Sequence, residues 1–246
     1  MSLTLVVPAW ATAAGSTTDH PPDLTGIWAQ YSGPAAGSAP LGGRRPELPL
    51  TPLGRQKMAE YHRLVAPSDT PGAHCLGSGM PESMMFSGIY PMEIIQRPEQ
   101  ITIIYEAHSE IRRLYFGSHI LAPDDRLPAR DGYSAAHWEA DTLVVETSAL
   151  KEQEDQMYPH SDQARIVERY QLQQGPQGGR VLVADWTMTD PLFYTQPVHA
   201  QKRWSLDPHG VLLPYECDEE GWLDHLQQLR QRPVTASHAA PANPTE

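Results

Sequence analysis

Residues 164–206 read ARIVERYQLQQGPQGGRVLVADWTMTDPLFYTQPVHAQKRWSL. Three runs in this stretch are rich in β-branched and aromatic residues, namely 164–172, 180–188 and 198–206. The two segments between them contain Gly and Pro, which are typical of turns. Three extended runs joined by two short turns predict an antiparallel meander of strands.

The register of these strands brings ionisable residues together. If both turns are symmetric, Glu168 faces Asp185 and Asp185 faces Lys202, because positions 168, 185 and 202 are spaced evenly. Side chains two positions apart share a face, and the neighbours of these three are mainly apolar. We therefore expect one cross-strand row that points inward. Two alternatives stay open: a one-residue slip in either turn separates the groups, or the row is an ion-pair ladder on a solvated face.

Such a row has the residue types that acid–base catalysis needs. Two carboxylates at cross-strand distance do not both ionise easily, so one of them retains a proton. Glu168 or Asp185 would then act as acid or base, and Lys202 as an electrostatic partner.

The rest of the chain continues the strand pattern. The 24 Pro and 18 Gly residues fall between short apolar runs, which favours many short strands over long helices. Further strands are expected at 25–29, 92–97, 101–107, 110–116, 133–138 and 141–147. The prediction is an all-β fold, an antiparallel lipocalin-like barrel of about nine strands with one or two short helices, with a sandwich as the alternative.

The domain organisation follows from the same pattern. Residues 23–217 are expected to form a single barrel domain with a long irregular insertion at 31–90, which contains a short helix over about 53–64. Thr51 and Pro52 are a suitable N-cap and first helical residue for that helix. A short helix is expected at 218–232, and the Pro/Ala-rich tail 233–246 is expected to be disordered.

Several features indicate an exported protein. Residues 1–14 resemble the end of a signal peptide, with an apolar core and a small-x-small pattern, although no Lys or Arg precedes that core. Cys75 and Cys217 would then form a disulfide, with free thiols as the alternative. No other run has the length of a membrane span. The net charge of −12 disfavours nucleic acid as a partner. We expect a periplasmic or secreted protein of unknown oligomeric state.

Other residues are candidates for binding or catalysis. The loop His160-Ser161-Asp162 precedes the strand of Glu168, so His160 is a candidate second base and Asp162 a candidate ligand contact; a surface turn is the alternative. Further candidates for substrate binding on the strands are Arg113, Tyr105, Tyr170 and Trp204.

Common cofactor motifs do not occur in the sequence. HExxH, HxxxH and CxxC are missing, so no metal site is predicted, although ligands from separate strands would leave no local motif. GxGxxG, Walker-type and GxSxG motifs are missing too, so neither a nucleotide cofactor nor serine hydrolysis of the usual kind is expected. We expect no organic cofactor.

Two resemblances add to these predictions. Gly26-Ile27-Trp28 is similar to the Gly-x-Trp start of lipocalin-like barrels, in which the Trp packs against the barrel end. More of the chain resembles a large family of exported bacterial lipocalin-like (calycin-type) barrel proteins. The matching segments include Cys75 to Pro81, Arg112-Arg113, Trp138 to Val145, Glu168-Arg169-Tyr170 and Tyr215-Glu216-Cys217. The resemblance covers most of residues 23–217. It implies a barrel fold and export, but it does not imply a particular activity. The chain departs from the family pattern at Tyr133-Ser134 and Ala140.

The sequence supports two functions. The first is an enzyme of lyase, hydratase or isomerase type that acts on a small apolar or aromatic molecule by acid–base chemistry. The second is a non-catalytic periplasmic binding protein for a small hydrophobic ligand. A carrier requires a wide apolar cavity, whereas an enzyme requires titratable groups that converge on one pocket.

Overall fold

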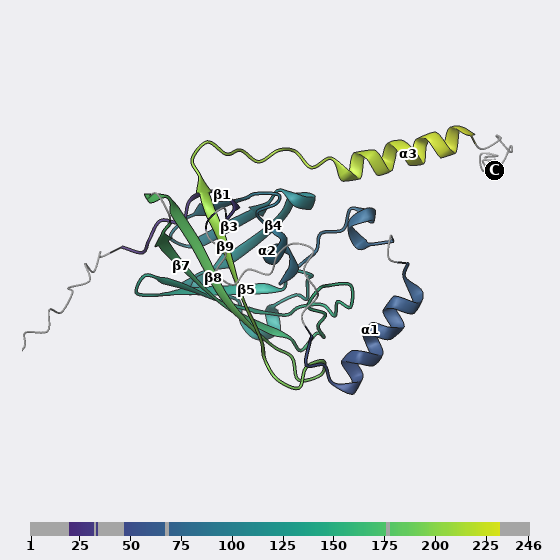
Figure 1. Ribbon diagram of the computed structural model, residues 1–246, viewed down its shortest axis with the longest axis horizontal. Helices are drawn as coiled ribbons and strands as arrows, with labels where there is room; N and C mark the ends of the chain where they lie inside the picture. Colours follow the sequence, from purple (N-terminus) through teal and green to yellow (C-terminus); the bar gives the residue numbers. More distant parts are fainter. Residues whose placement is uncertain (1–19, 32, 34–46, 67–68, 176–177, 232–246) are drawn as a thin grey trace, which may run out of the picture.

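The computed structural model describes residues 20–31, 33, 47–66, 69–175 and 178–231. Within these ranges, nine strands form a closed barrel in sequence order (Figure 1). The strands are β1 Gly26–Gln30, β2 Met92–Gln96, β3 Gln100–Tyr105, β4 Glu110–Tyr115, β5 Tyr133–Glu139, β6 Thr142–Ser148, β7 Arg165–Gln174, β8 Arg180–Thr189 and β9 Val198–Asp207. All nine expected strands are present, with ends that differ by at most two residues. The expected signal peptide (1–14) and tail (233–246) lie outside the described residues.

One strand pair departs from the expected antiparallel pattern. β4 and β5 are parallel, with Leu114 opposite Ser134 and Tyr115 opposite Ala135. The connection 116–132 explains the difference, because it is long enough to return the chain to the end where β4 began. The barrel is therefore mixed, and its other neighbouring pairs are antiparallel.

Three α-helices accompany the barrel in the described ranges. They are α1 Pro52–Leu64, α2 Glu82–Phe86 and α3 Cys217–Gln231. Thr51 caps α1 as expected, since its hydroxyl accepts a hydrogen bond from the Gly54 amide at 3.1 Å. Among these helices, none combines the length and the apolar character that a membrane-spanning helix needs.

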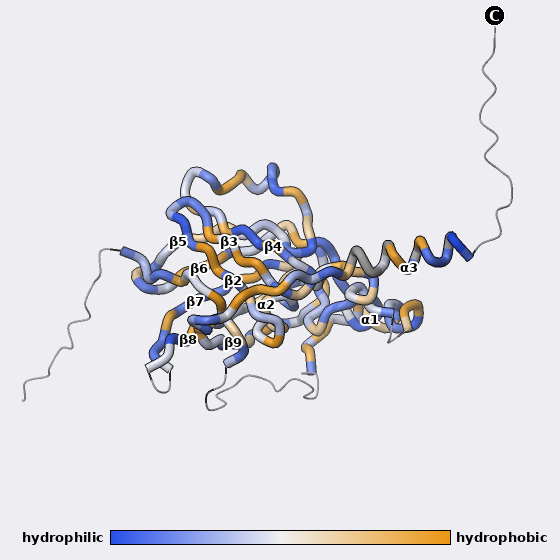
Figure 2. The backbone as a smooth tube through the Cα atoms, turned by 90° about the horizontal axis from the view of Figure 1, so that it is seen from above, coloured by the Kyte–Doolittle hydropathy of each residue, from blue (hydrophilic) through white to orange (hydrophobic). Residues whose placement is uncertain are grey.

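Large aromatic side chains occupy the barrel interior. In β3 and β7, buried residues alternate with more exposed ones. Figure 2 colours the backbone by hydropathy and shows apolar and polar stretches following one another along the barrel. Trp28, Trp186 and Trp204 are at most 2% exposed. The Trp28 indole N–H donates to the Leu24 carbonyl at 2.9 Å. The expected burial of Trp28 is confirmed.

A segment that we call the plug, residues 78–90, packs against the barrel through α2. Met80 and Met84 within it are fully buried. The indole N–H of Trp186 contacts the Met85 sulfur at 3.0 Å, and that of Trp204 donates to the Ser87 hydroxyl at 3.0 Å. These contacts join the plug to β8 and β9. This part of the expected irregular insertion, residues 78–90, is therefore ordered and packed into the core.

The predicted disulfide is present. Cys75 and Cys217 are bonded, with their Cα atoms 5.5 Å apart, and neither is a free thiol. The bridge joins the short 3-10 turn Pro71–His74 to the first residue of α3.

Reduction of this bridge should leave the barrel folded. The strands β2 to β9 lie between the two cysteines and make their own ladders, so only loop-closure entropy and local contacts are lost. We expect the intact mass to rise by about 2 Da on reduction under native-like conditions. Cys75→Ser should lower the free energy of unfolding by about 2–4 kcal/mol, measured with urea. An unchanged mass would contradict the bridge.

Candidate functional site

The predicted row of three ionisable residues does not form. Glu168 lies opposite Trp186, Asp185 lies opposite Arg169 and Gln201, and Lys202 lies opposite Ala184. Each turn shifts the pairing by one residue from the symmetric expectation, which moves Asp185 to the outer face. Asp185 is exposed, and its carboxylate accepts a hydrogen bond from the Gln201 amide at 2.7 Å. The expected pairing of Glu168 with Asp185 is wrong.

Glu168 does point inward, as predicted, but its partner is Arg112. The guanidinium of Arg112 donates to both carboxylate oxygens, at 3.1 Å and 2.8 Å. Both side chains are at most 1% exposed. Burial by itself lowers the pKa of Arg112, but the Glu168 charge outweighs it and holds that pKa well above its usual value. A two-pronged pair of this kind is the strongest geometry available to an ion pair.

Neutral side chains satisfy the remaining donors around this pair. Arg112 also donates to Ser134 at 3.1 Å and to Thr147 at 2.8 Å. The Tyr170 hydroxyl lies 3.4 Å from one Glu168 oxygen, and burial raises the Tyr170 pKa. Because the pair is closed on all sides by the core, we assign Glu168 and Tyr170 a structural part rather than contact with substrate.

Lys202 and Trp204 face inward toward the plug. The ammonium group of Lys202 donates to the Met85 carbonyl at 2.8 Å, and burial lowers its pKa to about 8. Trp204 is fully buried and bonded to Ser87. Both residues therefore anchor the plug to β9.

The loop around His160 is also an anchor. His160 is fully buried, and its ring nitrogens lie 3.0 Å from the Met80 carbonyl and 3.1 Å from the Ser161 carbonyl. Burial lowers the pKa of His160, which favours the neutral ring. Asp162 is exposed, away from the plug contacts. The carboxylate that contacts this loop is that of Asp190, just after β8, which accepts hydrogen bonds from the amide and hydroxyl of Ser161.

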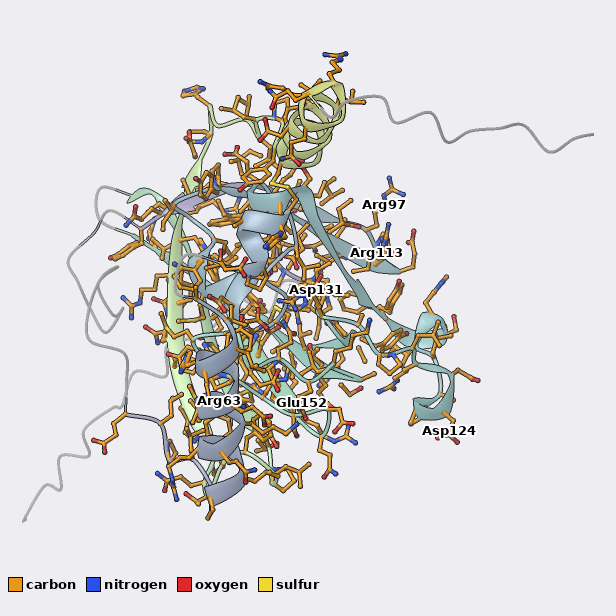
Figure 3. All side chains as sticks on the ribbon, turned by 90° about the vertical axis from the view of Figure 1, so that its right-hand side faces the viewer. Arg63, Arg97, Arg113, Asp124, Asp131 and Glu152 are labelled. Atoms are coloured by element: carbon orange, nitrogen blue, oxygen red, sulfur yellow. A yellow bond between two sulfur atoms is a disulfide. The ribbon has the colours of Figure 1, made fainter. Side chains whose placement is uncertain are left out.

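Arg113 points outward, contrary to the expectation that it faces the cavity. It is exposed, and Figure 3 shows its side chain extending away from the barrel. Ile111, which lies on the same face of β4 as Arg113, is also 48% exposed. The inward arginine on β4 is Arg112, one position earlier.

Alternation along β4 places a residue that the sequence reasoning missed on the inner face. Glu110 shares its face with Arg112, and it pairs with Tyr105 across β3 and β4. Its carboxylate accepts hydrogen bonds from the Gly79 amide at 2.9 Å and from the Ser83 hydroxyl at 2.5 Å. The plug therefore holds Glu110 in one orientation.

Asp131 lies beside Glu110 and carries a proton. Burial raises the pKa of Asp131 to about 8, and the nearby Glu110 carboxyl adds to this effect. One Asp131 oxygen is buried without a hydrogen-bond partner among the described residues, and Figure 3 shows Asp131 among closely packed side chains. Glu110 and Asp131 thus form a carboxyl pair in which the raised pKa of Asp131 favours its neutral form.

This proton makes stability depend on pH. The folded-state pKa of Asp131 is above its ordinary 3.8, so its stabilising contribution is complete below about pH 4 and is lost as the pH rises to about 8. We expect the free energy of unfolding to fall across this window by up to about 1.4 kcal/mol per pH unit. Urea titrations at pH 5 and pH 8 measure the slope. Asp131→Asn should flatten it, whereas Asp141→Asn, an exposed control, should not.

A pocket of about 270 Å³ opens in front of Glu110. We call it the mouth pocket; it is lined by plug residues and by Tyr105, Ala107, His108 and Glu110. Two of the residues that line this pocket have a buried polar atom that makes no hydrogen bond to the described residues, namely the Tyr105 hydroxyl and the His108 Nδ1. Burial raises the Tyr105 pKa, so its hydroxyl is protonated and able to donate. Unpaired buried polar atoms at a pocket are where a ligand supplies the missing partner.

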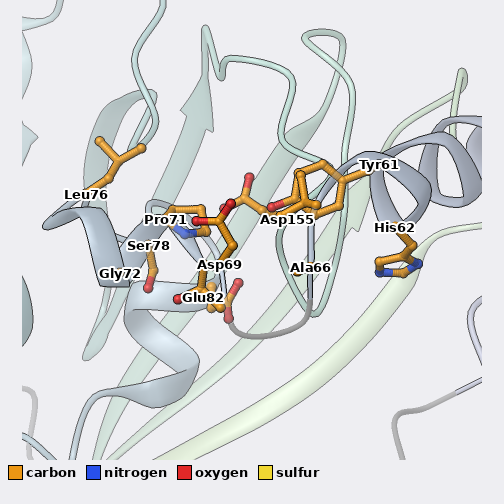
Figure 4. Close-up of a pocket in the computed structure, with 12 residues that line it drawn as sticks. Tyr61, His62, Ala66, Asp69, Pro71, Gly72, Leu76, Ser78, Glu82 and Asp155 are labelled. Atoms are coloured by element: carbon orange, nitrogen blue, oxygen red, sulfur yellow. The ribbon is translucent and has the colours of Figure 1, made fainter.

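A larger pocket of about 620 Å³ is lined in part by the plug residues Ser78 and Glu82 (Figure 4). Its carboxylates are largely engaged: Asp69 pairs with His74 and Asp155 pairs with Arg130. No described group of three or more His, Cys, Asp or Glu residues is placed to hold a metal ion. The mouth pocket is therefore the better candidate site.

Comparison with family models, with curated proteins and with solved structures finds no match to this chain.

Proposed function

We propose that this protein is an enzyme that moves protons on a small, partly aromatic or apolar molecule bound in the mouth pocket. The observation that carries the proposal is a pair of neighbouring carboxyl groups: Glu110 lines the pocket, and Asp131 lies beside it with its pKa raised by burial to about 8. Paired carboxyl groups of this kind separate the roles of base and acid at neutral pH. The reaction class is isomerase, hydratase or lyase, with no organic cofactor.

Each residue has a role that its contacts support. Glu110 is the base: the Gly79 amide and the Ser83 hydroxyl donate to its carboxylate and hold it at the pocket. It removes a proton from the carbon next to a carbonyl, and the electron pair moves to the carbonyl oxygen. In this proposal Tyr105, which lines the pocket, is the donor to that oxygen. Glu110 returns the proton to the neighbouring carbon of the substrate, which completes the product and restores the base, and neutral Asp131 beside Glu110 stabilises the base through their contact.

The lining favours a ligand with an aromatic or branched body. Phe86, Ile89 and Tyr90 line the pocket on the plug side, and Ile89 and Tyr90 are each 48% exposed. His108 lines the opposite side. A flat apolar group would cover this exposed surface while its polar end reaches Glu110.

The carrier hypothesis has less support. The barrel interior, where a carrier holds its ligand, is occupied by Trp28, Trp186 and Trp204 and by the Arg112–Glu168 pair. The mouth pocket is small for a drug-sized ligand. Export stays part of the proposal, and the disulfide is compatible with it.

A test follows hydrogen–deuterium exchange by NMR in D₂O for a panel of enolisable carbonyl compounds with aromatic or branched bodies. We expect the wild type to exchange the proton next to the carbonyl of at least one compound. Glu110→Gln should slow that exchange by about 100-fold or more, because the base is lost. Glu146→Gln is the control, since Glu146 is exposed on β6. Exchange of no compound by the wild type, or equal rates in Glu110→Gln and wild type, contradicts the proposal.

A further inference from the structure

The outer edge of the mouth pocket is in contact with a segment that we call the strap, residues 208–217. Figure 1 shows this connection between β9 and α3 crossing the barrel end. The Tyr215 ring lies 4.8 Å from the His108 ring, centroid to centroid, and 6.1 Å from the Tyr90 ring. His108 and Tyr90 both line the mouth pocket. Tyr215 therefore contacts two of the residues that line the pocket.

The disulfide joins the two elements that flank His108. On one side is Tyr215, two residues before Cys217. On the other is Gly72, where an added Cβ would lie 3.3 Å from the His108 ring, three residues before Cys75. The Cys75–Cys217 bond links these sides directly.

Few other described contacts hold the strap. The Leu213 amide donates to the Glu106 carboxylate at 2.7 Å, in an exposed position. Val211 and Leu213 are 68% and 63% exposed. A segment with so little buried surface opens at low free-energy cost once its covalent tether is released.

Ring contacts, and not a hydrogen bond at Nδ1, fix the orientation of His108. Its Nδ1 has no partner among the described residues, and its backbone is in the left-handed region at φ 58°. The neighbours that define the imidazole plane are thus Tyr215 and the turn at Gly72.

We infer that the Cys75–Cys217 disulfide is a latch on the mouth pocket: in the oxidised protein it holds Tyr215 over His108, and reduction releases the strap and opens the pocket. The inference rests on the proposed function, because it concerns access to that site. A dithiol supplies the two electrons and two protons; its own thiols become a disulfide, and Cys75 and Cys217 become thiols. Tyr215 is then a positioning residue for His108.

The test measures the modification rate of His108 by diethyl pyrocarbonate, read by peptide mass spectrometry. On reduction with a dithiol, the rate should rise about fivefold, which corresponds to the loss of one aromatic ring contact. Tyr215→Leu, with the disulfide intact, should produce a similar rise. His62, exposed on α1, is the internal reference, and Tyr115→Leu is the control tyrosine variant, since Tyr115 stacks on Tyr133 away from the strap.

A second readout separates this inference from the proposed function. The ¹H and ¹³C signals of the His108 ring, assigned with His108→Gln, should shift on reduction and in Tyr215→Leu, because the Tyr215 ring current is lost. Unchanged His108 rates and signals in both states overturn the latch. ¹³C titration of the Glu110 and Asp131 carboxyls tests the proposed function independently. If Asp131 is already ionised well below neutral pH, the proposed enzyme function is contradicted, whereas the inference about the disulfide is unaffected.

Discussion

Arg112→Met is expected to destabilise the protein by about 3–5 kcal/mol, because it leaves the Glu168 carboxylate buried without its cationic partner. The lost interactions are two hydrogen bonds to Glu168 and one each to Ser134 and Thr147. Water cannot replace them, since the pair is at most 1% exposed. Urea unfolding followed by tryptophan fluorescence measures the change, with the slope of the transition as a check on two-state behaviour.

Two control variants make this result specific to the ion pair. Arg113→Met removes the same side chain one position along β4, where it is exposed, and should change stability by less than about 0.5 kcal/mol. The double variant Arg112→Met/Glu168→Leu should recover much of the loss, because it removes both charges together. A loss below about 1 kcal/mol for Arg112→Met, or an equal loss for Arg113→Met, would show that the pair does not organise the core.

Trp28→Ala is the second large effect, at about 3–5 kcal/mol. The side chain is fully buried, and the space it leaves lies between β2 and β9, where Met92 and Leu206 are its cross-strand partners. The hydrogen bond from its indole to Leu24, which holds the chain just before β1, is lost as well. Thermal and urea denaturation give the change.

A graded series distinguishes packing from the hydrogen bond. Trp28→Phe keeps an aromatic ring in the site, so it should cost clearly less than Trp28→Ala. Trp138→Ala, at a half-buried position on β5, is the comparison for a less buried tryptophan and should also cost less. If Trp28→Ala costs no more than Trp138→Ala, then Trp28 is not the anchor that closes β1 onto the barrel.

The candidate site was recognisable from the sequence only in part. Tyr105 was expected to face a cavity, and it does line the mouth pocket. Glu110 alternates with Arg112 and Leu114, which would have placed it on the inner face had the phase of β4 been known. Both faces of β4 carry apolar residues, so alternation alone selects Arg113 as readily as Arg112. Asp131 lies in a connection with no periodic pattern, and its proximity to Glu110 leaves no trace in the sequence.

What the sequence by itself determined is local: nine strands within two residues of their observed ends, the capped helix α1, and the inward side of β7 with Glu168 on it. These features depend on alternation, turn residues and caps, which act over a few positions. The tertiary structure decided the rest. A one-residue change in each turn sent Asp185 outward, and the closure of the barrel brought Arg112 to Glu168 across 56 positions of sequence. The plug completed the site by bringing Gly79 and Ser83 to Glu110. Local patterns cannot predict this contact, because packing of this kind, unlike strand formation, depends on residues that are far apart in the chain.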